Sequence, residues 1–152
     1  MGDFYSVDEI LEFAIVREVE ANEFYMDLSR RLESPAMREL VLEFAKEELE
    51  HKAKLELEAM KEGIVVTAAE KVAEFEIAVY IPDVELNDDM GYKDLLILAA
   101  KKERRALRLY IDLAAIIENA DSRETLLSLA VEEAKHEARF EIEYDEVLLK
   151  GK

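Results

Sequence analysis

The sequence has no cysteine, and only two histidines, two prolines and four glycines among 152 residues. Without cysteine the chain can form no disulfide, no thiolate zinc site and no iron–sulfur cluster. Because residues that break helices are rare, the composition favours a helical fold. No apolar run approaches the roughly 18 residues that a membrane-spanning helix needs, and no secretory signal pattern opens the chain. We therefore expect a soluble cytoplasmic protein with no membrane partner.

Positive charge is also scarce, with 20 Lys and Arg against 37 Asp and Glu and a formal net charge of −17. This balance argues against a nucleic-acid partner, because phosphate backbones are bound by clustered basic residues. Most of the acidic residues are expected on exposed helix faces, where they give solubility. The length suits one domain over residues 1–152 that buries its own core.

The two histidines occur in the same short motif, Glu-x-x-His, which appears once in each half of the chain. Residues three apart on a helix lie on one face, so each motif places a carboxylate beside an imidazole. A further glutamate precedes each motif by thirty residues. The six residues are Glu18, Glu48 and His51 in the first half and Glu103, Glu133 and His136 in the second.

These motifs belong to a longer internal repeat. When residues 11–59 are aligned without gaps on residues 96–144, 18 of 49 positions are identical. Tyr25 then aligns with Tyr110, and the two histidines occupy equivalent positions. Composition alone does not give so many identities, so the chain contains two copies of one structural unit.

Each copy has the apolar spacing of two helices. The four expected helices cover residues 7–32, 35–62, 92–118 and 122–149, and a short fifth helix over 67–79 lies in the connection between the copies. Capping-box patterns at Ser6, Thr67 and Asp121 mark three of the starts. The sequence thus predicts an all-α, ferritin-like four-helix bundle made of two repeated helical hairpins joined by a long crossover.

All six candidate residues lie in the apolar stripes of these helices, where an unpaired charge is costly. No Lys or Arg in the stripes balances the four carboxylates, whereas two divalent cations would. A single Glu-x-x-His would more often be a surface pair, but two at core positions, each with its upstream glutamate, indicate a dinuclear metal site. Carboxylate and imidazole ligands suit iron, manganese or zinc, and this set is typical of ferritin-like di-iron and di-manganese sites.

Tyr25 and Tyr110 fall on the same stripes and have two interpretations. Their hydroxyls could donate hydrogen bonds to the ligand carboxylates, or the rings could simply pack in the core. Asn22 is a similar candidate, but its repeat position holds Leu107, so any role for Asn22 breaks the two-fold symmetry.

Over nearly its whole length, this pattern resembles the rubrerythrin branch of the ferritin-like superfamily. The resemblance implies that Glu48 and Glu133 bridge two iron ions, with manganese or a mixed centre as alternatives. It further implies that the other glutamates and the histidines fill the terminal positions. Rubrerythrins usually carry a cysteine-rich rubredoxin domain and an extra carboxylate where this chain has Ala106. We therefore expect an external electron-donor protein and a more symmetric centre.

Three functions fit these residues. The first is a di-iron redox enzyme that reduces hydrogen peroxide or dioxygen, expected as a homodimer. The second is a ferritin-like ferroxidase or iron-storage protein, expected as a large cage. Against storage, no short helix is expected after the one over 122–149, where ferritin cages have one, and Leu49 stands where bacterioferritins have the methionine that binds haem. The third is a bundle whose metal is purely structural.

Overall fold

The described part of the chain, in a computed structural model, comprises residues 7–61, 80 and 85–150. It contains four long helices and no strand. The helices are α1 (Val7–Arg31), α2 (Pro35–Ala59), α4 (Tyr92–Ile116) and α5 (Ala120–Leu149). This confirms the expected all-α fold, with helix ends within about three residues of the predicted ones. The expected helix over 67–79 and the caps at Ser6 and Thr67 lie outside the described residues.

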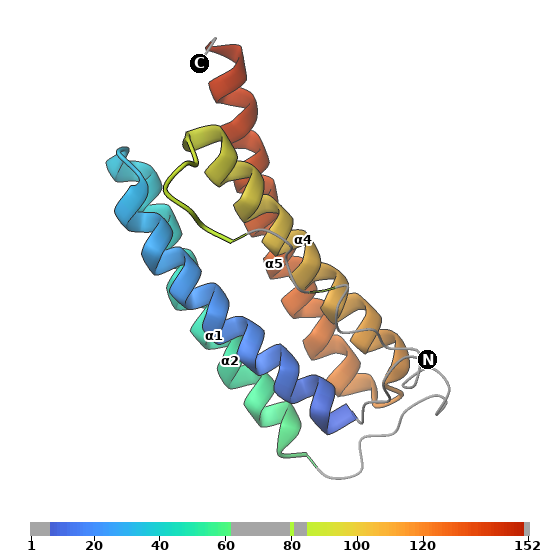
Figure 1. Cartoon of the computed structure of the whole chain (residues 1–152). Helices are drawn as coiled ribbons and strands as arrows, with labels where there is room; N and C mark the ends of the chain where they lie inside the picture. Colours follow the sequence, from blue (N-terminus) through green and yellow to red (C-terminus); the bar gives the residue numbers. More distant parts are fainter. Residues whose placement is uncertain (1–6, 62–79, 81–84, 151–152) are drawn as a thin grey trace, which may run out of the picture.

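Each repeat forms one antiparallel hairpin, α1 with α2 and α4 with α5 (Figure 1). The hairpins meet through α1 with α4 and through α2 with α5. The end of α2 and the start of α4 lie at opposite ends of the bundle, so the second hairpin runs in the reverse direction to the first (Figure 1). Equivalent residues of the two repeats therefore face each other across the middle of the bundle. No helix among the described residues is long and apolar enough to cross a membrane.

The two hairpin corners use equivalent caps. The Ser34 hydroxyl accepts a hydrogen bond from the backbone N–H of Met37 at 3.3 Å, and the Asn119 side chain accepts one from Ser122 at 2.9 Å. Side chains at this position satisfy N–H groups that the first turn leaves without partners. The predicted cap at Asp121 is wrong, because Asn119 already fills that role and Asp121 lies within the first turn.

One arginine at each corner donates to a backbone carbonyl oxygen just after the end of the preceding helix. Arg38 donates to the carbonyl oxygen of Leu32 at 3.3 Å, and Arg123 donates two hydrogen bonds to the carbonyl oxygen of Ile117 at 2.7 and 3.0 Å. Cationic side chains near a helix C-terminus satisfy carbonyls that have no intrahelical partner. Arg123 is the repeat equivalent of Arg38, so the internal repeat includes the contacts at the turns between the helices of each hairpin.

The core consists of two apolar clusters, one toward each end of the bundle. One contains residues 10–14 of α1 with 109–117 of α4, and the other contains residues 24–32 of α1 with 95–99 of α4. On every helix the candidate metal ligands lie between the segments that enter the two clusters. The bundle therefore holds one polar layer between two apolar ones.

Candidate metal centre

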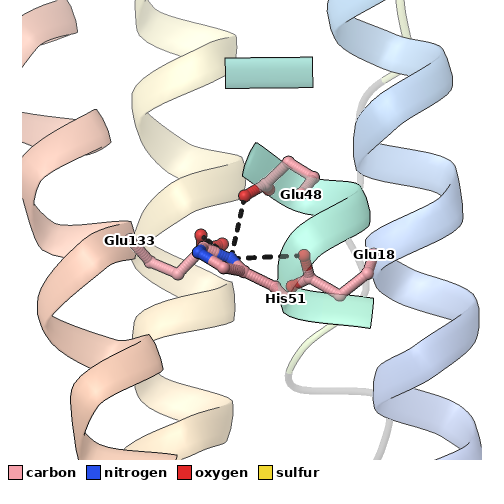
Figure 2. Close-up of side chains that lie close together, drawn as sticks. All are labelled: Glu18, Glu48, His51 and Glu133. Atoms are coloured by element: carbon pink, nitrogen blue, oxygen red, sulfur yellow. Dashed lines mark ion pairs between the residues drawn. The ribbon is translucent and has the colours of Figure 1, made fainter. Parts of the chain in front are cut away.

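The polar layer brings all six candidate residues together. None of them is more than 3% exposed, and side chains from α1, α2 and α5 point toward one another in Figure 2. The buried seam of α2 has the spacing expected from the sequence, so Glu48 and His51 face inward one turn apart. The six residues are Glu18, Glu48, His51, Glu103, Glu133 and His136.

His51 lies between three carboxylates. Its Nδ1 atom is 3.0 Å from Glu133 Oε1, 3.1 Å from Glu48 Oε1 and 3.5 Å from Glu18 Oε2 (Figure 2). One ligand atom from each of these four residues lies within 4.8 Å of all the others. This quartet therefore has the size of a single metal-binding site.

His136 forms the centre of a second quartet. Its Nδ1 atom lies 3.5 Å from Glu103 Oε1, 3.7 Å from Glu48 Oε1 and 3.8 Å from Glu133 Oε1. Glu48 and Glu133 belong to both quartets, whereas each histidine and each remaining glutamate belongs to one. Two quartets that share two carboxylates are an arrangement that could hold a pair of metal ions.

The electrostatics of the layer favour protonated carboxyl groups when no metal is bound. Burial, followed by repulsion from Glu103 and Glu18, raises the pKa of Glu48 to about 8. Burial and neighbouring carboxylates likewise raise the pKa of Glu133 well above its usual range. For His51, burial lowers the pKa, but the carboxylates of Glu18 and Glu48 outweigh it and raise the pKa to about 10.

A metal pair fits the atoms that this layer leaves without partners. Both carboxylate oxygens of Glu48 and of Glu133 are buried without a hydrogen bond, as are the Nδ1 atoms of His51 and His136. The histidine nitrogens lie at ion-pair distances from the carboxylates, but no pair meets the geometry of a hydrogen bond. Buried polar atoms without partners are rare and costly. Coordination to cations would satisfy them, so the donor set fits two metal ions.

The two tyrosines connect the repeats. Tyr25 on α1 donates a hydrogen bond to Glu103 on α4, and Tyr110 on α4 donates one to Glu18 on α1. Burial and the adjacent carboxylates raise the pKa of both phenols well above its ordinary value, so both remain donors. Of the two interpretations from the sequence, the hydrogen-bonding one describes these contacts, and both rings are also buried in the core.

The surroundings of the two histidines differ. The ring of Phe44 stacks on His136 with centroids 3.8 Å apart, while the repeat equivalent of Phe44 is Leu129. Glu47 Oε1 also lies 3.6 Å from the Nε2 atom of His136. Asn22 donates a hydrogen bond to the backbone carbonyl oxygen of Ala45 at 2.8 Å rather than to one of the six central residues. The six central residues keep the two-fold symmetry, but the packing around them does not.

A cavity of about 60 Å³ reaches the four carboxylates from the side of α1 and α4. Glu18, Glu48, Glu103 and Glu133 line it, whereas neither histidine does. Ala21 and Ala106 also line it, each three residues after a candidate ligand glutamate, and their small side chains leave room there. The cavity therefore meets the centre on the face opposite the histidines.

Three basic side chains, Arg17, Lys102 and Arg105, also line this cavity. Burial lowers the pKa of the Lys102 ammonium, nearby carboxylates oppose the change, and the charges of Arg17 and Arg105 add to it. These residues were missed in the sequence because basic residues are ordinary on helix surfaces. A usable signal was present, since Arg17 and Lys102 are repeat equivalents that each directly precede a candidate ligand.

Fold and cluster together define a ferritin-like bundle with a buried carboxylate–histidine layer that indicates a di-metal site. The family model for rubrerythrin matches residues 9–144, and the chain belongs to the rubrerythrin family. This confirms the resemblance seen in the sequence.

Two solved structures share the fold. One is a protein from Thermotoga maritima described as a ferritin-like diiron-carboxylate protein, with 21% identity and a TM-score of 0.78 over 97% of this chain and 99% of that one. The other is a hypothetical protein from Pyrococcus furiosus, with 26% identity and a TM-score of 0.74 over 95% of this chain and 91% of that one. No curated protein matches the chain at a significant level.

Proposed function

We propose that this protein is a non-haem di-iron redox protein that reduces hydrogen peroxide or dioxygen with electrons from an external donor protein. The observation that supports this proposal is the pair of buried quartets that share Glu48 and Glu133 and border a cavity on their carboxylate side. A purely structural metal site needs no such cavity. A homodimer is part of the proposal.

In this proposal Glu18 and His51 would hold one iron, Glu103 and His136 would hold the other, and Glu48 and Glu133, which belong to both quartets, would contribute to both sites. The bound pair would supply the two electrons that reduction of peroxide requires. Metal binding requires deprotonated ligands, so Glu48 and His51, whose pKa values are raised without metal, would release protons on loading. The apolar clusters above and below exclude water, and the cavity leaves one side open to a small oxidant.

Anaerobic stopped-flow mixing tests the redox proposal. Protein loaded with two ferrous ions per chain is mixed with hydrogen peroxide or with dioxygen while ferric absorbance is followed. We expect oxidation by both, with peroxide faster, because the two electrons of one diferrous pair reduce peroxide completely to water, whereas dioxygen needs four. Faster oxidation by dioxygen with accumulating mineral would support ferroxidase and storage instead. Unchanged absorbance with both oxidants would leave only a structural metal.

The tyrosine contacts give a paired prediction about metal affinity. Tyr25→Phe should free Glu103 and weaken the His136 quartet, while Tyr110→Phe should free Glu18 and weaken the His51 quartet. Loss of a partner that orients a ligand costs roughly 10–100-fold in metal affinity. Chelator competition should therefore show one weakened metal in each variant.

Tyr92→Phe is the matched control for these variants, because Tyr92 donates to Glu143 at 2.6 Å, away from the six central residues. That variant should keep both metal affinities. If the Tyr25 and Tyr110 variants bind both metals as tightly as this control, the phenols serve only as core packing.

A further inference from the structure

The two nitrogen atoms of the His136 ring have different surroundings. The Nδ1 atom lies near three carboxylates of the cluster, whereas the Nε2 atom lies 3.6 Å from Oε1 of Glu47, which is not one of the six central residues. The Nε2 atom is buried and forms no hydrogen bond within the described structure. Glu47 has no other ion pair among the described residues, so its carboxylate is available to this nitrogen.

His51 lacks an equivalent of this contact. Its ion pairs with described residues all involve the Nδ1 atom. The repeat equivalent of Glu47 is Glu132, and Glu132 instead pairs with Lys135 at 3.4 Å on its own helix. The two repeats therefore differ at the histidine nitrogen that lies outside the carboxylate layer.

Aromatic packing fixes the orientation of the His136 ring. Phe44 stacks on one face of it at an interplanar angle of 19°, and the ring of Tyr25 lies nearly perpendicular to it, with the centroids 6.3 Å apart. Both aromatic residues are themselves buried. The imidazole is therefore held with Nδ1 toward the cluster and Nε2 toward Glu47.

This orientation suits a metal-binding histidine. A neutral imidazole has a hydrogen on one nitrogen and a lone pair on the other, so metal binding through Nδ1 requires the hydrogen on Nε2. Metal-binding histidines commonly donate that N–H to a carboxylate, which fixes the tautomer and makes the other nitrogen a better ligand. Glu47 is the only acidic side chain among the described residues within ion-pair distance of Nε2 in His136.

We propose that Glu47 is a positioning residue for His136 and makes the His136 quartet the tighter of the two metal sites, so that this quartet fills first. The inference rests on the proposed function, because Glu47 supports His136 only when a metal binds Nδ1. Partners of this kind contribute roughly 10–100-fold to metal affinity. We expect the two quartets to differ in affinity by about that factor.

Zinc titration of protein labelled with nitrogen-15 in its histidines tests the order of filling by nuclear magnetic resonance. Zinc is diamagnetic and accepts carboxylate and imidazole ligands. The chain has only two histidines, so each ring can be followed, and metal-free His51→Gln protein assigns the signals. In the wild type the His136 ring should respond to the first zinc ion and the His51 ring to the second. The Nε2–H group of His136 should then exchange slowly with water.

Glu47→Gln removes the carboxylate and keeps the size of the side chain. Zinc affinity of the His136 quartet should fall roughly 10–100-fold, so both rings should respond together, and the Nε2–H group should exchange faster. Glu132→Gln is the matched control at the equivalent position of the other repeat and should leave the order and the exchange rate unchanged. Glu47 and Glu132 are both partly exposed, so both variants should keep the wild-type melting temperature.

The outcomes separate this inference from the proposed function. A wild-type protein in which His51 responds first, or both rings respond together, would overturn the role of Glu47 alone. Equal behaviour of the Glu47 and Glu132 variants would also overturn it, because a distant charge would then act as strongly as the neighbouring one. If zinc changes neither ring, the di-metal centre and the proposed function fail as well.

Discussion

Replacing His51 and His136 together with alanine is expected to abolish tight metal binding. Each histidine is the only imidazole in its quartet, and its Nδ1 atom is buried without another hydrogen-bond partner. The loss of metal affinity should exceed roughly 100-fold, which is the upper range for removing a residue that only hydrogen-bonds to a ligand. Metal analysis after dialysis should fall from two ions per chain to none.

A matched control for this variant replaces the neighbouring exposed residues Glu50 and Lys135 with alanine. These residues precede the two histidines, occupy equivalent repeat positions and face solvent, so two ions should remain. Far-ultraviolet circular dichroism checks that the helices persist in both proteins. Two tightly held ions in the histidine variant would show that the metals bind elsewhere.

Metal removal is expected to lower the melting temperature by an amount that grows with pH. When the free metal concentration is about 100 times the dissociation constant, each occupied site adds about 2.7 kcal/mol to the free energy of unfolding. Two sites then add about 5 kcal/mol, or about 10–20 °C for a protein of this size. Because metal displaces protons from its ligands, this gain should be smaller at pH 5 than at pH 8.

The stability of the metal-free protein should fall as the pH rises, because the fold raises the pKa values of Glu48 and His51. Glu48 has a pKa of about 8 in the fold against an ordinary value of 4.5, so the fold retains a proton that the unfolded chain loses. The stability linked to this proton is present below about pH 4.5 and is lost as pH rises through 8. His51 extends the loss upward, since its pKa rises from 6.5 to about 10.

Thermal melts of chelator-treated protein between pH 5 and pH 10 check this trend. Glu48→Gln should make the melting temperature less dependent on pH, because the amide cannot ionise. Glu50→Gln, on the exposed face of α2, should leave the pH dependence unchanged. Melting temperatures that rise with pH in the metal-free protein would mean that the carboxylates are ionised and solvated rather than buried together.

The sequence by itself determined the helices, the two-hairpin repeat and the level at which six polar residues meet. These follow from local physics, because the 3.6-residue helical period fixes the face on which Glu48 and His51 lie. The thirty-residue spacing then fixes how far along each hairpin the upstream glutamate falls. Burial of this layer also follows, since each of its positions continues an apolar stripe.

Only the tertiary structure decided which residues face each other across the repeats. Periodicity cannot show that Tyr25 reaches Glu103 rather than Glu18, because that depends on how two hairpins dock in reverse directions. The stacking of Phe44 on His136 and the opening beside Ala106 likewise depend on side-chain volumes from several helices at once. Such contacts join residues far apart in the chain, and helix spacing constrains only residues on the same helix.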